Sequence, residues 1–152
     1  MPDIACVNGE FCDVANARVS IEDRGFQFAD GVYEVIVAPG GVPFLLEAHL
    51  ERLASSLAGI ELRVDLAELR VAELVKTGIE RCGYRDVMVY IQITRGVASR
   101  NHAMPERVTP TVVMTFKAKP VYDAALRKDG VALKTVRDNR WARCNIKSIA
   151  LL

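Results

Sequence analysis

Residues 87–94 read VMVYIQIT and residues 111–118 read TVVMTFKA. Both runs are rich in β-branched and aromatic residues, which is the composition typical of β-strands. A third run of this kind, VYEVIV at 32–37, ends at a Pro-Gly-Gly turn at 39–41. The three runs therefore predict the main strands of a sheet, and the two long ones are separated by a polar loop.

Two segments between these runs predict helices. The first, 47–60, has apolar residues at three- and four-residue spacing, which makes one apolar stripe on a helix. The second, 66–82, has Asp65 as its predicted N-cap, Glu68 three residues later, and Gly83 in position to close it. The residues of the first stripe are Leu46, Leu50, Leu53, Leu57 and Ile60.

Strands and helices together predict an α+β fold, in which an antiparallel sheet is packed with two helices. Two further segments, 4–8 and 18–21, are short and apolar enough to be predicted as edge strands. No internal repeat or low-complexity tract interrupts this pattern.

A domain boundary is predicted near residue 120. Residues 1–120 form the N-terminal α+β domain, 121–130 a connector, and 131–152 the beginning of a second domain that opens with a strand at 131–137. The chain stops at KSIALL, an apolar segment with no cap and no partner element. We therefore expect the 152 residues to be a piece of a longer protein.

Composition and charge exclude several classes of partner. Twenty basic and nineteen acidic residues leave a formal net charge of +1, so no global field favours nucleic acid or a membrane surface. No apolar run is long enough to span a bilayer. The four cysteines have no C-x-x-C spacing and are predicted to be free thiols of a cytoplasmic protein. The only histidines, His49 and His102, are far apart, so no metal site is predicted.

Residues 23–35, DRGFQFADGVYEV, form the first segment that could carry chemistry. Gly25 and Gly31 allow a close backbone approach just before a strand, so the segment could be a tight turn that presents Tyr33 and Glu34. The alternative is an ordinary turn into a strand. The segment is not a phosphate-binding P-loop, since no G-K-[ST] follows.

Arg52, in the predicted helix at 47–60, is a second candidate. An arginine on an amphipathic helix is usually a solvated surface residue, but its planar fork can also bind phosphate. A third candidate is the pair Arg100 and His102 in the loop 95–110, because residues two apart in extended backbone point to one side. Together they could bind a carboxylate, or they could belong to a basic surface loop.

Lys147 is the fourth candidate. It lies in RWARCNIKS, residues 140–148, among the apolar residues Trp141, Ile146 and Ile149. Burial favours the neutral amine of a lysine, which is the form needed for Schiff-base chemistry. Most lysines are simply exposed, and exposure is the alternative here.

Taken together and in order, these segments resemble the fold-type IV pyridoxal-phosphate enzymes, and most closely the D-amino-acid (D-alanine) aminotransferases. The resemblance rests on DRGFQFADGVYEV, HLERL, QITRGVASRNH and RWARCNIKS and covers nearly the whole chain. It implies pyridoxal 5'-phosphate as cofactor, held by Lys147 in a Schiff base, with Lys147 also acting as the general base. It further implies that Arg52 contacts the cofactor phosphate.

The same resemblance implies how substrates bind. Tyr33, Arg100 and His102 would bind the substrate α-carboxylate, with the loop of Arg100 and His102 reaching into the neighbouring subunit of a homodimer. A carboxylate site on one side of the cofactor, with Lys147 on the other, decides which face of Cα loses its proton. The implied reaction transfers an amino group from a D-amino acid such as D-alanine to a 2-oxo acid such as 2-oxoglutarate.

Two other readings remain open from the sequence. Branched-chain aminotransferases and aminodeoxychorismate lyases share the implied fold and lysine. The resemblance also implies a second domain of comparable size, which supplies an acid facing the pyridine nitrogen. The chain could therefore be an inactive fragment that only dimerises.

Overall fold

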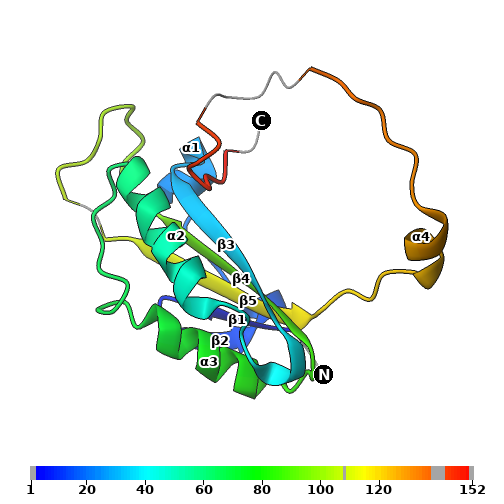
Figure 1. Ribbon diagram of the computed structural model, residues 1–152. Coiled ribbons are helices and arrows are strands. Elements are labelled where there is room, and N and C mark those ends of the chain that lie inside the picture. Colours follow the sequence, from blue (N-terminus) through cyan, green and yellow to red (C-terminus); the bar gives the residue numbers. More distant parts are fainter. Residues whose placement is uncertain (1–2, 108, 138–142, 151–152) are drawn as a thin grey trace.

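A five-stranded antiparallel sheet is the frame of the computed structural model, which describes residues 3–107, 109–137 and 143–150. The strands lie side by side in the order β2-β1-β5-β4-β3, and each neighbouring pair is antiparallel (Figure 1). The three main strands predicted from the sequence are confirmed. The strands are β1 (Ile4–Val7), β2 (Glu10–Asp13), β3 (Gly31–Ala38), β4 (Val87–Thr94) and β5 (Thr111–Ala118).

Two long helices cover one face of this sheet (Figure 1). Helix α2 (Leu46–Gly59) packs on β3, and α3 (Val71–Cys82) packs on β1, β4 and β5. The predicted apolar stripe is confirmed, because three of its leucines are buried and its other two members pack against the same core. The short elements are η1 (Val14–Asn16), α1 (Arg24–Phe28), η2 (Pro39–Gly41) and α4 (Ala124–Asp129).

Strict alternation along β3, β4 and β5 decides which side chains enter the core. Away from the strand ends, every second residue faces the helices and is buried, whereas the residues between them are half-buried on the other face. Each large aliphatic side chain buried in this way stabilises the fold by about 1.5–3 kcal/mol. The largest fully buried side chains come from these strands and from the helical side of the core, and they include Phe116, Ile36, Leu53, Leu62, Ile91, Ile93 and Met114.

The predicted strand at 18–21 is wrong. Those residues form no strand, and Val19 and Ile21 are 50% and 72% exposed. The strand at this edge of the sheet is β2 instead, which pairs with β1 through a tight hairpin. The other predicted edge strand, at 4–8, forms β1, but it lies inside the sheet between β2 and β5. Asn8 and Gly9, with φ of 50° and 90°, form the turn of that hairpin. Asn-Gly is the strongest short-range hairpin signal, so the sequence contained the evidence for β2.

The second predicted helix begins later than expected. Residues 66–70 are turns, and α3 starts at Val71 because Arg70 adopts a left-handed conformation with φ of 54°. Asp65 accepts a hydrogen bond from the Ala67 N–H and so caps a turn rather than the long helix. The end of the helix is as predicted, with Gly83 in the left-handed conformation.

After β5 the chain leaves the sheet through α4 and returns to it at 143–150 (Figure 1). The predicted strand at 131–137 is wrong, since these residues have no regular secondary structure and no described strand pairs with them. Residues 143–150 rejoin β3 through an isolated bridge between Ser148 and Val32. The boundary near residue 120 stays a prediction, and Trp141 lies outside the described residues.

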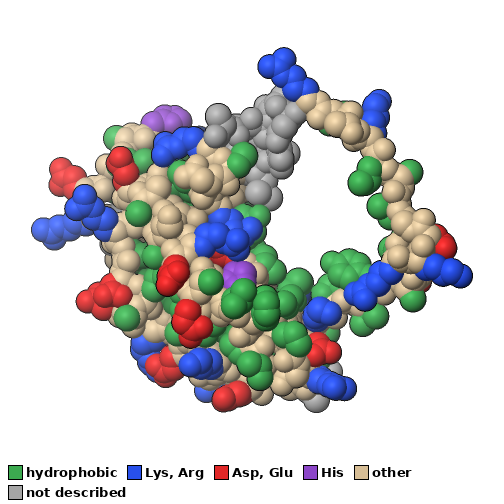
Figure 2. Space-filling model, viewed as in Figure 1, with side chains coloured by type: hydrophobic (Ala, Val, Ile, Leu, Met, Phe, Trp, Pro, Cys, Tyr) green, Lys and Arg blue, Asp and Glu red, His purple; other side chains and the backbone are tan. Residues whose placement is uncertain are grey.

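The helical face carries acidic and basic side chains side by side (Figure 2). Within the ranges that the structure describes, no helix is long and apolar enough to cross a membrane. Nor does this part of the chain bring together three His, Cys, Asp or Glu residues that could hold a metal ion.

Candidate active site

The most unusual residue of the core is Glu34. Its position in β3 directs it toward α2 together with Val32 and Ile36, and its side chain is fully buried. A carboxylate at such a position is stable only with hydrogen-bond and charge partners. Helix α2 supplies both partners from one face, because His49 and Arg52 are three residues apart.

Arg52 binds the Glu34 carboxylate through one edge of its guanidinium. Its Nε donates to Oε1 at 2.5 Å and its Nη2 to Oε2 at 2.6 Å, the two-pronged geometry of a strong charge-assisted pair. His49 Nδ1 lies 2.8 Å from Oε2 of the same carboxylate. The buried carboxylate therefore has partners on both oxygens.

Glu34 and Arg52 both stay charged over the physiological pH range. Burial alone would raise the pKa of Glu34, but the hydrogen bonds and charges of Arg52 and His49 outweigh it and hold that pKa below its ordinary value. The hydrogen bond to Glu34 in turn raises the pKa of Arg52, and the nearby Tyr33 contributes to the rise. Arg52 thus stays cationic beside Tyr33.

Arg52 is nevertheless 53% exposed. Its third nitrogen, Nη1, makes no hydrogen bond to any residue that the structure describes. A guanidinium that is oriented by one edge and exposed at the other is suited to binding an anion such as phosphate.

Lys147 lies next to Tyr33. The Tyr33 N–H donates to the Lys147 carbonyl at 2.9 Å, and the Lys147 N–H donates to Ser56 Oγ at 3.1 Å. The backbone of Lys147 is thereby fixed between β3 and α2. Its Nζ lies 4.1 Å from the centroid of the Tyr33 ring, and the lysine is half-buried rather than exposed.

Tyr33 also has an aromatic neighbour, Tyr90, on the sheet face opposite the helices. Tyr90 stacks on it with ring centroids 5.7 Å apart and donates its hydroxyl to Gln92 Oε1 at 2.8 Å. Burial, followed by the neighbouring Tyr33, raises the pKa of Tyr90, so that phenol stays neutral. The Tyr33 ring therefore contacts both a lysine amine and a second phenol ring.

Arg100 and His102 lie together, as the two-residue spacing predicted. Both contact the ring of Phe28: the Arg100 Cζ lies 4.7 Å from its centroid, and the His102 ring centroid lies 5.5 Å from it. Among the described residues, no hydrogen bond or ring contact joins either of them to Tyr33 or Lys147. One chain thus presents two separate groups of candidate residues.

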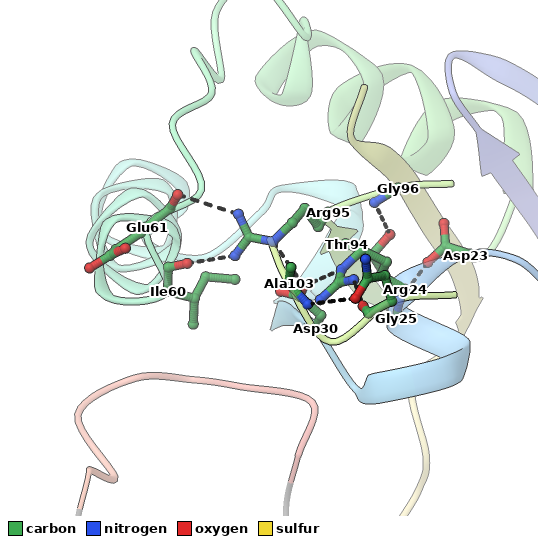
Figure 3. Close-up of polar contacts among 11 residues, drawn as sticks. Asp23, Arg24, Gly25, Asp30, Ile60, Glu61, Thr94, Arg95, Gly96 and Ala103 are labelled. Atoms are coloured by element: carbon green, nitrogen blue, oxygen red, sulfur yellow. Dashed lines mark hydrogen bonds and ion pairs between the residues drawn. The ribbon is translucent and has the colours of Figure 1, made fainter. Parts of the chain in front are cut away.

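A second ion-pair cluster lies beside Phe28 and was not singled out from the sequence. Asp30 Oδ2 accepts from Arg24 Nε and from Arg95 Nε, each at 2.8 Å (Figure 3). Gly25 lets α1 pack closely here, because a Cβ at that position would lie 2.2 Å from Thr94 Cγ2. The signal in the sequence was weak, since Asp30 and Arg95 are 65 residues apart.

The Glu34 cluster was partly foreseeable. The alternation of VYEVIV places an acid among apolar neighbours, and His49 and Arg52 share a helix face three residues apart. Ser56, which is 1% exposed and accepts from the Lys147 N–H, carried no such signal.

Comparison with known proteins assigns the chain to a family. Residues 31–152 match the amino-transferase class IV family, and the chain belongs to that family. The D-alanine aminotransferase of Staphylococcus haemolyticus is 39% identical over 149 residues, which are 96% of this chain and 52% of that protein. The D-alanine aminotransferase of Bacillus licheniformis is 40% identical over 147 residues, 95% of this chain and 51% of that protein.

Solved structures agree on the fold. The 4-amino-4-deoxychorismate lyase from Pseudomonas aeruginosa superposes with a TM-score of 0.71 at 28% identity, over 84% of this chain and 44% of that one. The predicted α+β fold of a fold-type IV enzyme is therefore confirmed. The chain spans about half the length of the curated relatives that it matches.

Proposed function

We propose that the protein to which this chain belongs is a pyridoxal-phosphate-dependent aminotransferase that acts on D-amino acids. It transfers the amino group of a D-amino acid such as D-alanine to a 2-oxo acid such as 2-oxoglutarate. The observation that carries the proposal is the placement of the Lys147 amine over the Tyr33 ring, with Arg52 oriented nearby by buried Glu34. Relatives named D-alanine aminotransferase at 39–40% identity support it.

Arg52 fits the role of holding the cofactor phosphate. Glu34 occupies one edge of its guanidinium and secures its charge, while Nη1 and half of the side chain stay accessible. Phosphate binding through that open edge costs little reorganisation, because the arginine is already held in place.

Lys147 fits the role of holding the cofactor covalently and of moving the proton at the substrate Cα. Pyridoxal phosphate, when bound, supplies the electron sink for the pair of electrons that this proton leaves behind. Hydrogen bonds to Tyr33 and Ser56 fix the backbone of Lys147. The amine can therefore move only as far as rotation of the lysine side chain allows. Tyr33 lies within reach of the same reacting centre.

Arg100 and His102 supply the carboxylate site from the other subunit of a homodimer. Their separation from Tyr33 and Lys147 within one chain supports this arrangement, because one chain alone does not bring the two groups into contact. Arg100 forms no ion pair with any described residue, so its charge is available to a substrate carboxylate.

A lyase acting on aminodeoxychorismate is the second candidate. The similarity to the lyase from Pseudomonas aeruginosa favours it, although at lower identity than the D-alanine aminotransferases. Assays of D-alanine, L-branched amino acids and aminodeoxychorismate with the same preparation separate the candidates. Turnover of D-alanine at least tenfold faster than the others is the expected result.

The direct test is a visible spectrum of the protein with added pyridoxal phosphate, before and after borohydride reduction, followed by peptide mass mapping. We expect a shifted absorption band that reduction fixes onto Lys147. Lys147→Ala should lose the band, and Lys76→Ala, on the exposed side of α3, should keep it as the matched control. A Lys147→Ala variant with normal turnover would disprove the proposal.

A further inference from the structure

We propose that Arg24 is a positioning residue for the substrate: together with Asp30 and Phe28 it holds the loop that carries Arg100 and His102. The inference rests on the proposed function, in which that loop binds the substrate carboxylate. It assigns to Arg24 a role in substrate affinity that differs from that of its equally buried neighbour Arg95.

The loop at 99–104 has little to hold it by itself. Every one of these residues is exposed, and none belongs to a helix or strand. An exposed loop without regular structure samples many conformations, so a carboxylate site built on it needs anchors to the body of the protein.

Arg24 is such an anchor. Its side chain is 5% exposed, and its Nε donates to Asp30 Oδ2 at 2.8 Å (Figure 3). Its Nη1 donates to the carbonyl oxygen of Asn101 at 2.8 Å. Asn101 is the residue between Arg100 and His102, so this bond fixes the backbone at the point from which both side chains project.

Phe28 adds a second anchor at the same place. The Arg24 Cζ lies 4.8 Å from the centroid of its ring, and Arg100 and His102 contact the same ring. Cation–π contacts of this kind contribute about twofold to fivefold each in an equilibrium constant at exposed sites. Arg24 and Phe28, both in α1, therefore hold backbone and side chains of the loop at once.

Arg95 provides a matched control within the same cluster. Its side chain is also 5% exposed, and its Nε donates to the same Asp30 oxygen at the same 2.8 Å. Its remaining donors, however, go to carbonyl oxygens beyond the end of α2, with Nη2 2.6 Å from the Ile60 oxygen and Nη1 3.4 Å from that of Glu61. Arg95 thus ties β4 to the end of α2 and not to the loop (Figure 3).

The experiment compares Arg24→Lys with Arg95→Lys in the full protein. A lysine keeps the charge beside Asp30 but has no fork with which to bridge two acceptors. We expect Arg24→Lys to raise KM for both the amino acid and the 2-oxo acid about tenfold with kcat nearly unchanged, because both substrates carry the carboxylate. Arg95→Lys should change both KM values by less than about twofold.

A second measurement does not depend on turnover. Amide hydrogen exchange of peptides that cover 97–104 should be about tenfold faster in Arg24→Lys and unchanged in Arg95→Lys. If Arg24→Lys does not fold, Phe28→Leu is the second variant, because it removes the ring that Arg24, Arg100 and His102 contact. It should raise the two KM values in the same way.

Equal effects of the two lysine substitutions on KM and on exchange would overturn the inference, since both would then act only through stability. Failure of the proposed function looks different. A wild-type protein that transfers no amino group overturns that function and the substrate role of Arg24 with it. The exchange contrast then still shows whether Arg24 holds the loop.

Discussion

Two carboxylates near the start of β3 each bind two basic side chains: Asp30 binds two arginines, and Glu34 binds an arginine and a histidine. The two clusters differ in how exposed their arginines are. At Asp30 the acid is 10% exposed and both arginines, Arg24 and Arg95, are 5% exposed. At Glu34 the acid is fully buried, while Arg52 is 53% exposed. The first cluster is closed to solvent on its cationic side, and the second is open there.

The difference separates a structural arginine from one that can bind a ligand. Arg24 and Arg95 direct their donors to Asp30 and to backbone carbonyls in other segments, so they tie segments together. Arg52 uses only the edge that faces Glu34. A buried arginine whose donors bind groups in other segments stabilises a fold, whereas an exposed arginine held by one edge is ready for an anion.

Asp30→Asn should have the largest effect, because it leaves two buried guanidinium groups without a counter-charge. We expect a loss of about 3–5 kcal/mol in the free energy of unfolding, measured by urea denaturation. Glu73→Ala is the control, since it breaks the fully exposed pair with Arg70 and should leave the urea midpoint nearly unchanged. Equal losses in both variants would contradict the distinction between the clusters.

Glu34→Gln should lower the free energy of unfolding by less, about 1.5–3 kcal/mol. Arg52 is half-exposed, so water can solvate its charge when the carboxylate is absent. Its effect on ligand binding should be specific for phosphate. With the guanidinium no longer held, the Kd of pyridoxal phosphate should rise about tenfold, while that of pyridoxal, which lacks the phosphate, should change little. A parallel change in both affinities would argue against Glu34 as the group that orients Arg52.

Lowering the pH should have the smallest effect on the free energy of unfolding. As the pH falls, the contribution of Glu34 should be lost before that of Asp30. Both have pKa values below their ordinary 4.5 and 3.8, so each contributes stability that is complete above the ordinary value and is lost as pH falls toward the lowered one. Between pH 7 and pH 4 we expect the two together to lose about 1 kcal/mol, mostly through Glu34. The prediction is checked by measuring the urea midpoints of the wild type and of Glu34→Gln between pH 7 and pH 4. If the midpoints of both proteins changed equally with pH, the prediction would be contradicted.

Much of the fold was predictable because its signals are local. Alternating apolar residues identified β3, β4 and β5, and the leucine stripe identified α2. Each pattern arises because one face of a single strand or helix packs against the core. The failures were at 18–21 and at 131–137, where apolar residues found no partner strand. A strand exists only when another strand accepts its hydrogen bonds, and short apolar runs do not encode that neighbour.

The sequence by itself indicated the family, and it supplied the candidate site residues Lys147, Arg52, Tyr33, Arg100 and His102, whose roles stay a proposal. Only the tertiary structure decided which of them meet, placing Lys147 on Tyr33 and Arg100 with His102 on Phe28. It alone disclosed Arg24, which reaches Asp30 six residues away and Asn101 seventy-seven residues away. The reason is physical: a buried charge is stable beside whatever acceptor the packed chain brings to it, and that proximity arises from packing rather than from local sequence.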